Sequence, residues 1–264
     1  MSRIFFLLTW LYASFSVADS IVIQSTTSTR DSGFYNYLLP KYPNYDSVTI
    51  KVIAVGSGQA VLNAKNCDGG ILIVHDTKKE QEFMNLGLGS KRLDLMYNDY
   101  IIIGPRNDPA KISSSKSAYE AFSRISKMKY KFISRSDSSG THTAEKNIWK
   151  NTDQYNDESF DISWYYETGQ GMGPTLNIAI AMNAYTLVDR STWLKFRNKQ
   201  NHVILYENSD ELQNTYGMIL VDLDRCSNIN RSATENLYEW LSGDDAKLLI
   251  DNYTIDGQNV FFTY

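Results

Sequence analysis

The amino-acid sequence predicts an α/β protein whose mostly parallel sheets are divided between two lobes. Short runs of β-branched residues alternate with helical segments, the pattern of parallel sheets flanked by helices. Several of these strands run into a helix through a turn rich in Ser, Thr and Gly. The length of 264 residues exceeds that of one average domain and suits two lobes of ordinary size.

The strands expected in the N-terminal part of the chain are residues 20–24, 48–55, 70–75 and 93–104. The second alternates and is β-branched, whereas the third is a continuous apolar run, typical of a buried parallel strand. The fourth is the longest and is followed by Pro105, and we expect it to cross between the lobes. Helices are expected to follow the first three strands, over residues 34–39, 59–65 and 78–82.

The strands expected in the C-terminal part are residues 130–134, 163–167, 185–188 and 218–222. The expected helices are residues 118–127, 139–150 and 175–183, one that begins at Asp189, and 233–241 as the last clear helix. In sheets of this class, ligands bind outside the carboxyl ends of the strands, where the strand-to-helix turns gather. The polar turns of this chain are therefore the expected place for a binding site.

The N-terminus has the pattern of a signal peptide. Residues 1–3 are short and basic, residues 4–17 are mostly apolar, and Ser16-Val17-Ala18 offers the small residues that a signal peptidase needs. Cleavage is expected before Asp19, and the mature protein should be exported, in the periplasm. A retained membrane anchor is the alternative, although the apolar run is shorter than a spanning helix requires.

Export affects how the two cysteines are interpreted. Cys67 and Cys226 would lie in an oxidising compartment, where they could form a disulfide or remain two buried free thiols.

The formal net charge is −4, which disfavours binding to nucleic acid. Any anion site in this chain must therefore work through local donors and dipoles.

Enzyme signatures are weak. The sequence has no phosphate-loop motif, no complete dinucleotide-binding motif, no GxSxG elbow and no HExxH pair among its three histidines. Carboxylate pairs such as Asp244-Asp245 are typical of solvated loops or helix caps. We expect no catalytic residue, no metal site and no cofactor, with an exported hydrolase or a scaffold that has lost its ligand as alternatives.

The strand-to-helix turns offer anion-binding chemistry instead. A helix start leaves N–H groups unpaired and carries partial positive charge, to which hydroxyl groups add further donors. A single turn is ambiguous, because Ser and Thr are also ordinary helix caps. The segment from Arg135 to Thr141 is more informative, since arginine presents a fork of donors to an oxyanion. Its alternative interpretation is a surface salt bridge with Asp137 beside a cap.

Several segments together resemble the periplasmic tungstate-binding proteins of ABC transporters. The matching segments are 25–33 (STTSTRDSG), 52–58 (VIAVGSG), 73–75, 96–105 (MYNDYIIIGP), 134–142 (SRSDSSGTH), 166–173 (YETGQGMG) and 184–193 (AYTLVDRSTW). They follow in order along nearly all of the mature chain. The resemblance implies a two-lobed periplasmic binding protein fold of type II, with residues 1–18 as signal peptide. It places residues 19–103 and 218–264 in lobe I, and residues 104–217 in lobe II.

The resemblance also implies which residues bind the ligand in the cleft. They are Thr26, Thr27, Ser28 and Ser57 on lobe I, and Arg135, Ser139, Gly140, Thr141, Gly171 and Met172 on lobe II, with Arg190 as a weaker candidate. Arg190 could equally cap a loop or pair with Asp189. The chain departs from the family pattern at Ser25 and Ser57, where threonine is usual, and at Gly70, where an aspartate is usual.

The function that the resemblance implies is capture of an oxyanion and its delivery to a membrane permease, by a protein expected to be a monomer. Tungstate is the expected ligand, and molybdate, sulfate and phosphate are alternatives. Phosphate carries a proton near neutral pH and needs an acceptor, whereas the other three need only donors. Phosphate becomes plausible if Asp137 faces the ligand, and the donor-only oxyanions are favoured if Asp137 pairs with Arg135.

Overall fold

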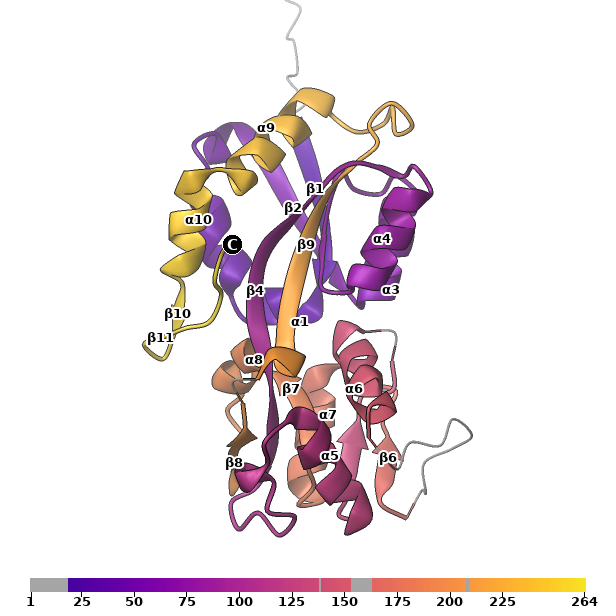
Figure 1. Cartoon of the computed structure of the whole chain (residues 1–264). Coiled ribbons are helices and arrows are strands. Elements are labelled where there is room, and N and C mark those ends of the chain that lie inside the picture. Colours follow the sequence, from indigo (N-terminus) through magenta and orange to yellow (C-terminus); the bar gives the residue numbers. More distant parts are fainter. Residues whose placement is uncertain (1–18, 138, 153–162, 208) are drawn as a thin grey trace, which may run out of the picture.

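The computed structural model describes residues 19–137, 139–152, 163–207 and 209–264, so the expected signal peptide lies outside the described residues. Figure 1 shows two bodies joined by the long strands β4 (Gly89–Pro105) and β9 (Gln213–Val221). Among the described residues, no helix is long and apolar enough to cross a membrane. The first body contains α9 and α4, and the second contains α5 and α6 (Figure 1).

Seven strands form one sheet in the order β2-β1-β3-β9-β4-β7, with β8 paired to β4. The first body holds β1 (Asp19–Thr26), β2 (Val48–Val55) and β3 (Ile71–Val74), together with most of β9 and the first part of β4. β1 pairs in parallel with β2 and β3, whereas β9 runs antiparallel to β3 and β4. The predicted α/β class is confirmed, but the expectation of mostly parallel sheets is wrong. The sheet is mixed, because β9 runs antiparallel to β3 and β4, and β4 runs antiparallel to β7 and β8.

Helices cover both faces of the sheet in the first body. They are α1 (Thr27–Asp31), α2 (Phe34–Leu38), α3 (Ser57–Lys65), α4 (Thr77–Asn85), α9 (Arg231–Ser242) and α10 (Asp244–Asp251). Leu72 and Val74 of β3 enter a core beneath α3 and α4, whereas Ile71 and Ile73 enter the core beneath α2, α9 and α10. Because β3 is buried on both faces, it is a continuous apolar run.

The second body is built around the end of β4, which pairs with β7 and β8. Its elements are α5 (Ala118–Lys127), β5 (Phe132–Ser134), α6 (Gly140–Lys150), β6 (Tyr165–Glu167), α7 (Met172–Ala181), β7 (Thr186–Asp189), α8 (Arg190–Lys195) and β8 (His202–Tyr206). β5 and β6 form a separate parallel pair. The core is aromatic, with the Phe122 ring centroid 4.3 Å from that of Trp149.

The remaining described elements are short. They are 3-10 helices at Leu39–Lys41, Tyr45–Ser47, Ile112–Ser114 and Asp210–Leu212, and a hairpin of β10 (Thr254–Ile255) and β11 (Gln258–Asn259).

Several elements were not expected from the sequence, among them α1, the β10–β11 hairpin, β8 and α10. β8 lies at the edge of the sheet, where most of its residues are only half-buried. It therefore lacks the alternation of buried and exposed positions that would mark it as a strand in the sequence. α10 follows α9 after Gly243, whose extended backbone ends one helix and begins the next. Asp244 and Asp245 lie in the first turn of α10, where the helix dipole stabilises negative charge.

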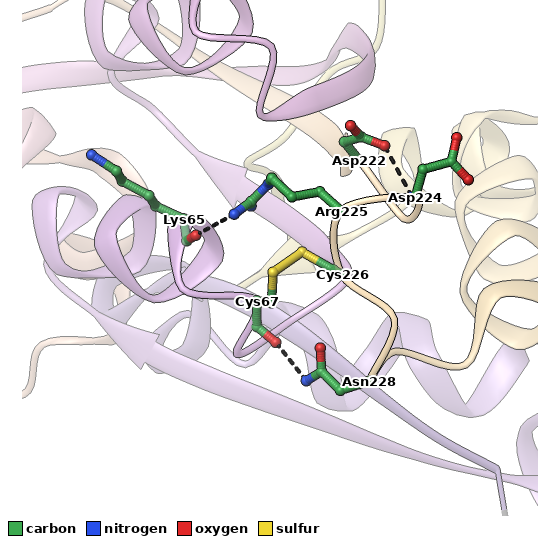
Figure 2. The surroundings of a disulfide bond; sticks show 7 residues. All are labelled: Lys65, Cys67, Asp222, Asp224, Arg225, Cys226 and Asn228. Carbon is green, nitrogen blue, oxygen red and sulfur yellow. Dashed lines mark hydrogen bonds between the residues drawn. A yellow bond between two sulfur atoms is a disulfide. The ribbon is translucent and has the colours of Figure 1, made fainter.

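Cys67 and Cys226 form a disulfide across a sequence separation of 159 residues, with their Cα atoms 5.4 Å apart. Figure 2 shows that it joins the loop after α3 to the loop after β9. Two side chains of the second loop donate hydrogen bonds across the same junction, from Arg225 Nη1 to the Lys65 carbonyl (2.8 Å) and from Asn228 Nδ2 to the Cys67 carbonyl (3.0 Å). The structure thus selects the disulfide over two free thiols.

Gly70 has no room for the aspartate that is usual in the family. A Cβ atom at this position would lie 2.6 Å from Cγ2 of Thr234 and 3.0 Å from Cγ2 of Ile229. Thr234 is fully buried, so the space next to Gly70 is filled by these side chains. Gly70 also precedes β3, at the opposite end of the strand from the polar turns. The glycine that replaces the usual aspartate therefore affects the packing against α9.

Candidate functional site

The turn between β1 and α1 holds three of the expected ligand residues. Thr26 ends β1, and its hydroxyl makes no hydrogen bond that caps α1. Instead, Thr26 Oγ1 lies 2.8 Å from Thr29 Oγ1 and 3.2 Å from Ser28 Oγ. Thr26 and Ser28 are buried and Thr27 is partly exposed. The hydroxyl groups of this turn therefore form a cluster that is separate from ordinary helix capping.

Ser57 begins α3 at the carboxyl end of β2. Its side chain is fully buried, and its hydroxyl has no hydrogen-bond partner among the residues that the structure describes. The N-cap of α3 is Gly56, which has no side chain to offer the helix start. A buried polar atom without a partner destabilises a fold unless a ligand or water satisfies it.

Arg135 follows β5 in the second body and is only 4% exposed. Its Nη2 donates to Asp137 Oδ2 at 2.6 Å, and its Nη1 lies 3.5 Å from Thr141 Oγ1. Its Nε has no hydrogen-bond partner within the described part of the chain. The salt bridge with Asp137 that the alternative interpretation expected is present, but the guanidinium is buried and keeps a donor without a partner.

Both carboxylate oxygens of Asp137 accept hydrogen bonds from its neighbours. Its Oδ2 accepts from Arg135, and its Oδ1 accepts from the backbone N–H of Ser139 at 3.3 Å and from the Ser139 hydroxyl. The Ser139 hydroxyl also caps α6 by accepting from His142 N at 3.2 Å. The acidic residue of this segment therefore holds the arginine and the helix start in place.

The start of α6 contacts the first body. A Cβ atom at Gly140 would lie 2.5 Å from the carbonyl oxygen of His75, which follows β3. Thr143 Oγ1 also donates to Asp76 Oδ2 at 3.2 Å. Thr141, between these contacts, is fully buried. The two bodies thus contact each other where the predicted ligand residues of the second body begin.

A cavity of about 220 Å³ joins the start of α1 to the start of α7. It is lined by Thr27, Ser28, Asp31, Met172, Gly173, Thr192, Lys195 and Phe196. The N-cap of α7 is Gly171, which is exposed and provides no side-chain cap. The cavity therefore brings Thr27 and Ser28 of the first body together with Met172 of the second.

Arg190 lies elsewhere. Its Nε and Nη2 donate to the carboxylate of Asp99 at 2.7 and 2.5 Å, and Nη2 also donates to Glu207 at 2.6 Å. It lines a separate cavity with Asp99 and Glu207. The alternative pairing of Arg190 with Asp189 is not formed either, because Asp189 accepts from Ser191 and Thr192. We therefore leave Arg190 out of the candidate site.

Two buried tyrosines, missed in the sequence, lie behind the polar turns. Burial raises the pKa of Tyr216 on β9 above its ordinary value, the Asp189 carboxylate adds to this, and a hydrogen bond with Ser28 lowers it. Burial likewise raises the pKa of Tyr100 on β4, whereas Arg135 and a hydrogen bond with Thr141 lower it. Both tyrosines are neutral near pH 7, and each contacts one predicted ligand residue. The only sign of these tyrosines in the sequence is that each places a polar hydroxyl group within a mostly apolar strand.

The described residues contain no group of three or more His, Cys, Asp or Glu side chains arranged to hold a metal ion. The donors of the predicted ligand residues are hydroxyls, helix-start N–H groups and one guanidinium. Such a set complements an anion that has no proton of its own.

Comparisons with known proteins show the family of this chain. The family model of the PBP superfamily domain matches residues 13–244. The tungstate-binding protein TupA of Peptoclostridium acidaminophilum is 39% identical over 236 residues, which cover 89% of this chain and 81% of that protein.

Two solved structures are also similar over most of the chain. The tungstate ABC transporter structure from Geobacter sulfurreducens has a TM-score of 0.79 and 38% identity, covering 89% of this chain and 98% of that one. TupA from Desulfovibrio alaskensis G20 has a TM-score of 0.81 and 32% identity, covering 94% and 99%. The resemblance and the two-lobed fold predicted from the sequence are confirmed, and the chain belongs to the PBP superfamily, in the family of the TupA tungstate-binding proteins.

Proposed function

We propose that this protein is the solute-binding component of an ABC importer, which captures tungstate between its lobes and delivers it to a membrane permease. The observation that carries the proposal is the pair of buried donors without partners, the Ser57 hydroxyl and Arg135 Nε, in the turns expected to hold the ligand. The family relationship to tungstate-binding proteins supports the choice of ion.

The proposed ligand residues are Thr26, Thr27, Ser28, Ser57, Arg135, Ser139, Gly140, Thr141, Gly171 and Met172. Arg135 supplies one full positive charge, and the other groups supply neutral donors that replace the hydration shell of the ion. Excluding water strengthens these interactions, because the local dielectric constant falls. Binding therefore involves capture without a chemical step, and we assign the protein no catalytic role.

The engagement of Asp137 favours an ion that needs donors only. Both of its carboxylate oxygens already accept hydrogen bonds, from Arg135 or Ser139, so fewer acceptor sites remain for the proton of hydrogen phosphate. Asp189, a buried acidic residue at the end of β7, likewise accepts hydrogen bonds from Ser191 and Thr192. Tungstate, molybdate and sulfate meet this requirement, and the relatives favour tungstate among them.

We place the first body and the second body as lobes I and II, with residues 19–103 and 218–264 in lobe I and residues 104–217 in lobe II. The pairing of β4 supports a crossover slightly earlier, since Asp99 still pairs with β9 and Tyr100 pairs with β7. We further propose that residues 1–18 direct export to the periplasm and are removed, and that the mature protein acts as a monomer.

Calorimetric titration of the mature protein with tungstate, molybdate, sulfate and phosphate tests the function. We expect tungstate to bind most tightly and phosphate most weakly, because only phosphate brings a proton that needs an acceptor. Tight binding of phosphate without binding of tungstate would reject the proposal. Absence of heat with all four ions would instead indicate a scaffold that has lost its ligand.

Replacing Gly140 by alanine should weaken tungstate binding. The new Cβ would lie 2.5 Å from the His75 carbonyl of the other body, so the two bodies could not approach as closely. Overpacking of this kind costs about 1–3 kcal/mol, so we expect Kd to rise about tenfold. Gly243→Ala is the matched control, because its new Cβ would make only ordinary contacts at 3.4 Å, away from the site. Equal affinities for the two variants would contradict the prediction.

A further inference from the structure

The residue that follows β6, Thr168, lies between two polar turns of the second body. One turn follows β5 and carries Arg135, and the other precedes α7 and carries Gly171 and Met172. Thr168 is partly exposed, and its hydroxyl is within hydrogen-bonding distance of residues in both turns. Thr168 therefore connects the two groups of proposed ligand residues that these turns carry.

On the first side, Thr168 binds both peptide groups that flank the Cα atom of Arg135. Its backbone N–H donates to the Ser134 carbonyl at 3.0 Å. Its hydroxyl lies 3.1 Å from the same carbonyl and 3.2 Å from the Arg135 carbonyl. Ser134 and Arg135 are buried. These contacts restrict the direction in which the arginine side chain leaves the backbone.

The next residue of the turn is also held by the end of β6. Ser136 has a φ of 44°, in the left-handed region that residues other than glycine seldom adopt. Its N–H donates to the Ser134 hydroxyl at 3.1 Å, and its hydroxyl donates to Glu167 Oε1 at 2.7 Å. A backbone of this kind persists only where its surroundings fix it. Glu167 and Thr168 together thus hold three successive residues of the turn.

On the second side, the Thr168 hydroxyl contacts the start of α7. It accepts from the backbone N–H of Gln170 at 3.2 Å, and it lies 3.0 Å from the Thr175 hydroxyl. Thr175 is fully buried, and its hydroxyl lies 3.0 Å from the carbonyl of Gly171, the N-cap of α7. Two hydroxyl groups in contact therefore join the Arg135 turn to the residue at which α7 begins.

This connection holds for either orientation of the hydroxyl protons. A hydroxyl donates one proton, and a carbonyl only accepts. Thr168 can donate to a carbonyl beside Arg135 and accept from Thr175. Alternatively, it donates to Thr175, which then donates to the Gly171 carbonyl, while the Thr168 N–H still binds Ser134. In both arrangements an unbroken run of hydrogen bonds through Thr168 joins the two turns.

We infer that Thr168 is a positioning residue for oxyanion binding, which holds Arg135 and the start of α7 in one arrangement so that both turns present donors to the same ion. This inference rests on the proposed function. Donors that are held in place before the ion arrives lose less conformational freedom on binding, which raises affinity. Thr168 acts on the ion through its neighbours, since its own hydroxyl is occupied by protein groups.

The main test variant is Thr168→Val, because valine keeps the branched shape and removes the hydroxyl. The Arg135 turn and the start of α7 could then move separately, so Kd for tungstate should rise about tenfold. Thr168→Ser keeps the hydroxyl and should bind nearly as tightly as the original protein. Calorimetric titration with tungstate measures the affinity of each variant.

A double-mutant cycle with Arg135→Ala shows whether Thr168 acts through the arginine. Without the arginine side chain, the Thr168 hydroxyl has less left to position, so Thr168→Val should raise Kd by about threefold at most in that background. Two residues that act independently would give losses that add. A residue that only stabilises the fold would also give an additive loss, so the cycle separates positioning from stability.

Thr186→Val is the matched control for the loss of a buried hydroxyl. Thr186 is 1% exposed, and its hydroxyl donates at 2.7 Å to the carbonyl of Ile133, which lies on β5 before the turn that Thr168 holds. Its replacement should lower the melting temperature of the ligand-free protein. It should leave Kd for tungstate close to the original value.

Three results would overturn the inference. They are an unchanged Kd in Thr168→Val, an equal loss of affinity in Thr186→Val, and an additive loss in the double variant with Arg135→Ala. Should Thr168→Val fail to fold, Thr175→Val breaks the same connection from the α7 side and should raise Kd for tungstate likewise. Failure of the unaltered protein to bind tungstate would instead count against the proposed function.

Discussion

Replacing Arg135 by alanine should weaken tungstate binding by at least about 2 kcal/mol, or roughly thirtyfold in Kd. Arg135 is buried, keeps Nε without a partner among the described residues, and is held by Asp137 and Thr141. The variant loses a charge-assisted hydrogen bond to the ion. It also leaves the Asp137 carboxylate without its counter-charge beside a dianion. Calorimetric titration measures the change.

Two further variants separate these effects. Arg135→Lys keeps the charge but loses the planar fork of donors, so it should restore part of the affinity. Arg190→Ala removes an arginine of the same body that is committed to Asp99 and Glu207, and it should leave the affinity for tungstate close to the original. An unchanged affinity in Arg135→Ala, or an equal loss in Arg190→Ala, would remove Arg135 from the site.

Replacing both Cys67 and Cys226 by alanine should lower the free energy of unfolding by about 2–5 kcal/mol. The expected loss lies towards the upper end of that range, because the disulfide closes a separation of 159 residues and the entropy removed from the unfolded chain grows with loop length. The bond also ties the loop after β9 to the loop after α3, the helix that begins at Ser57.

Denaturant unfolding with and without a reductant measures this contribution. The reduced protein and the double variant should unfold at the same lower midpoint, and the reductant should not change the double variant. A midpoint of the original protein that is insensitive to full reduction would contradict the prediction. Mass spectrometry after thiol alkylation provides the control for the redox state in each sample.

The sequence was informative wherever the signal is local. The apolar run of β3 and the turns before α2, α3 and α6 follow from neighbouring residues, which is why these strand ends and helix starts were expected close to their positions. The expected ligand residues Ser57 and Arg135 were found by the same local reading together with the family resemblance. Their burial without partners is a property of the folded chain alone.

What the sequence could not predict depends on partners far along the chain. Arg190 was a candidate because it begins a helix, but its partner Asp99 lies 91 residues away on β4. Tyr100 and Tyr216 meet the site only because β4 and β9 cross between the bodies. Long-range pairing of this kind has no local periodicity, so polar residues inside apolar strands could be noticed but their contacts could not be assigned.

The most direct test of the proposed site is a crystal structure of the mature protein with tungstate, in which anomalous scattering locates the tungsten atom. We expect a single strong peak between the two bodies, with the oxygens of the ion within hydrogen-bonding distance of Arg135, Ser57 and the turn of Thr27 and Ser28. A tungsten atom bound elsewhere, with Arg135 Nε and the Ser57 hydroxyl still without partners, would contradict the account.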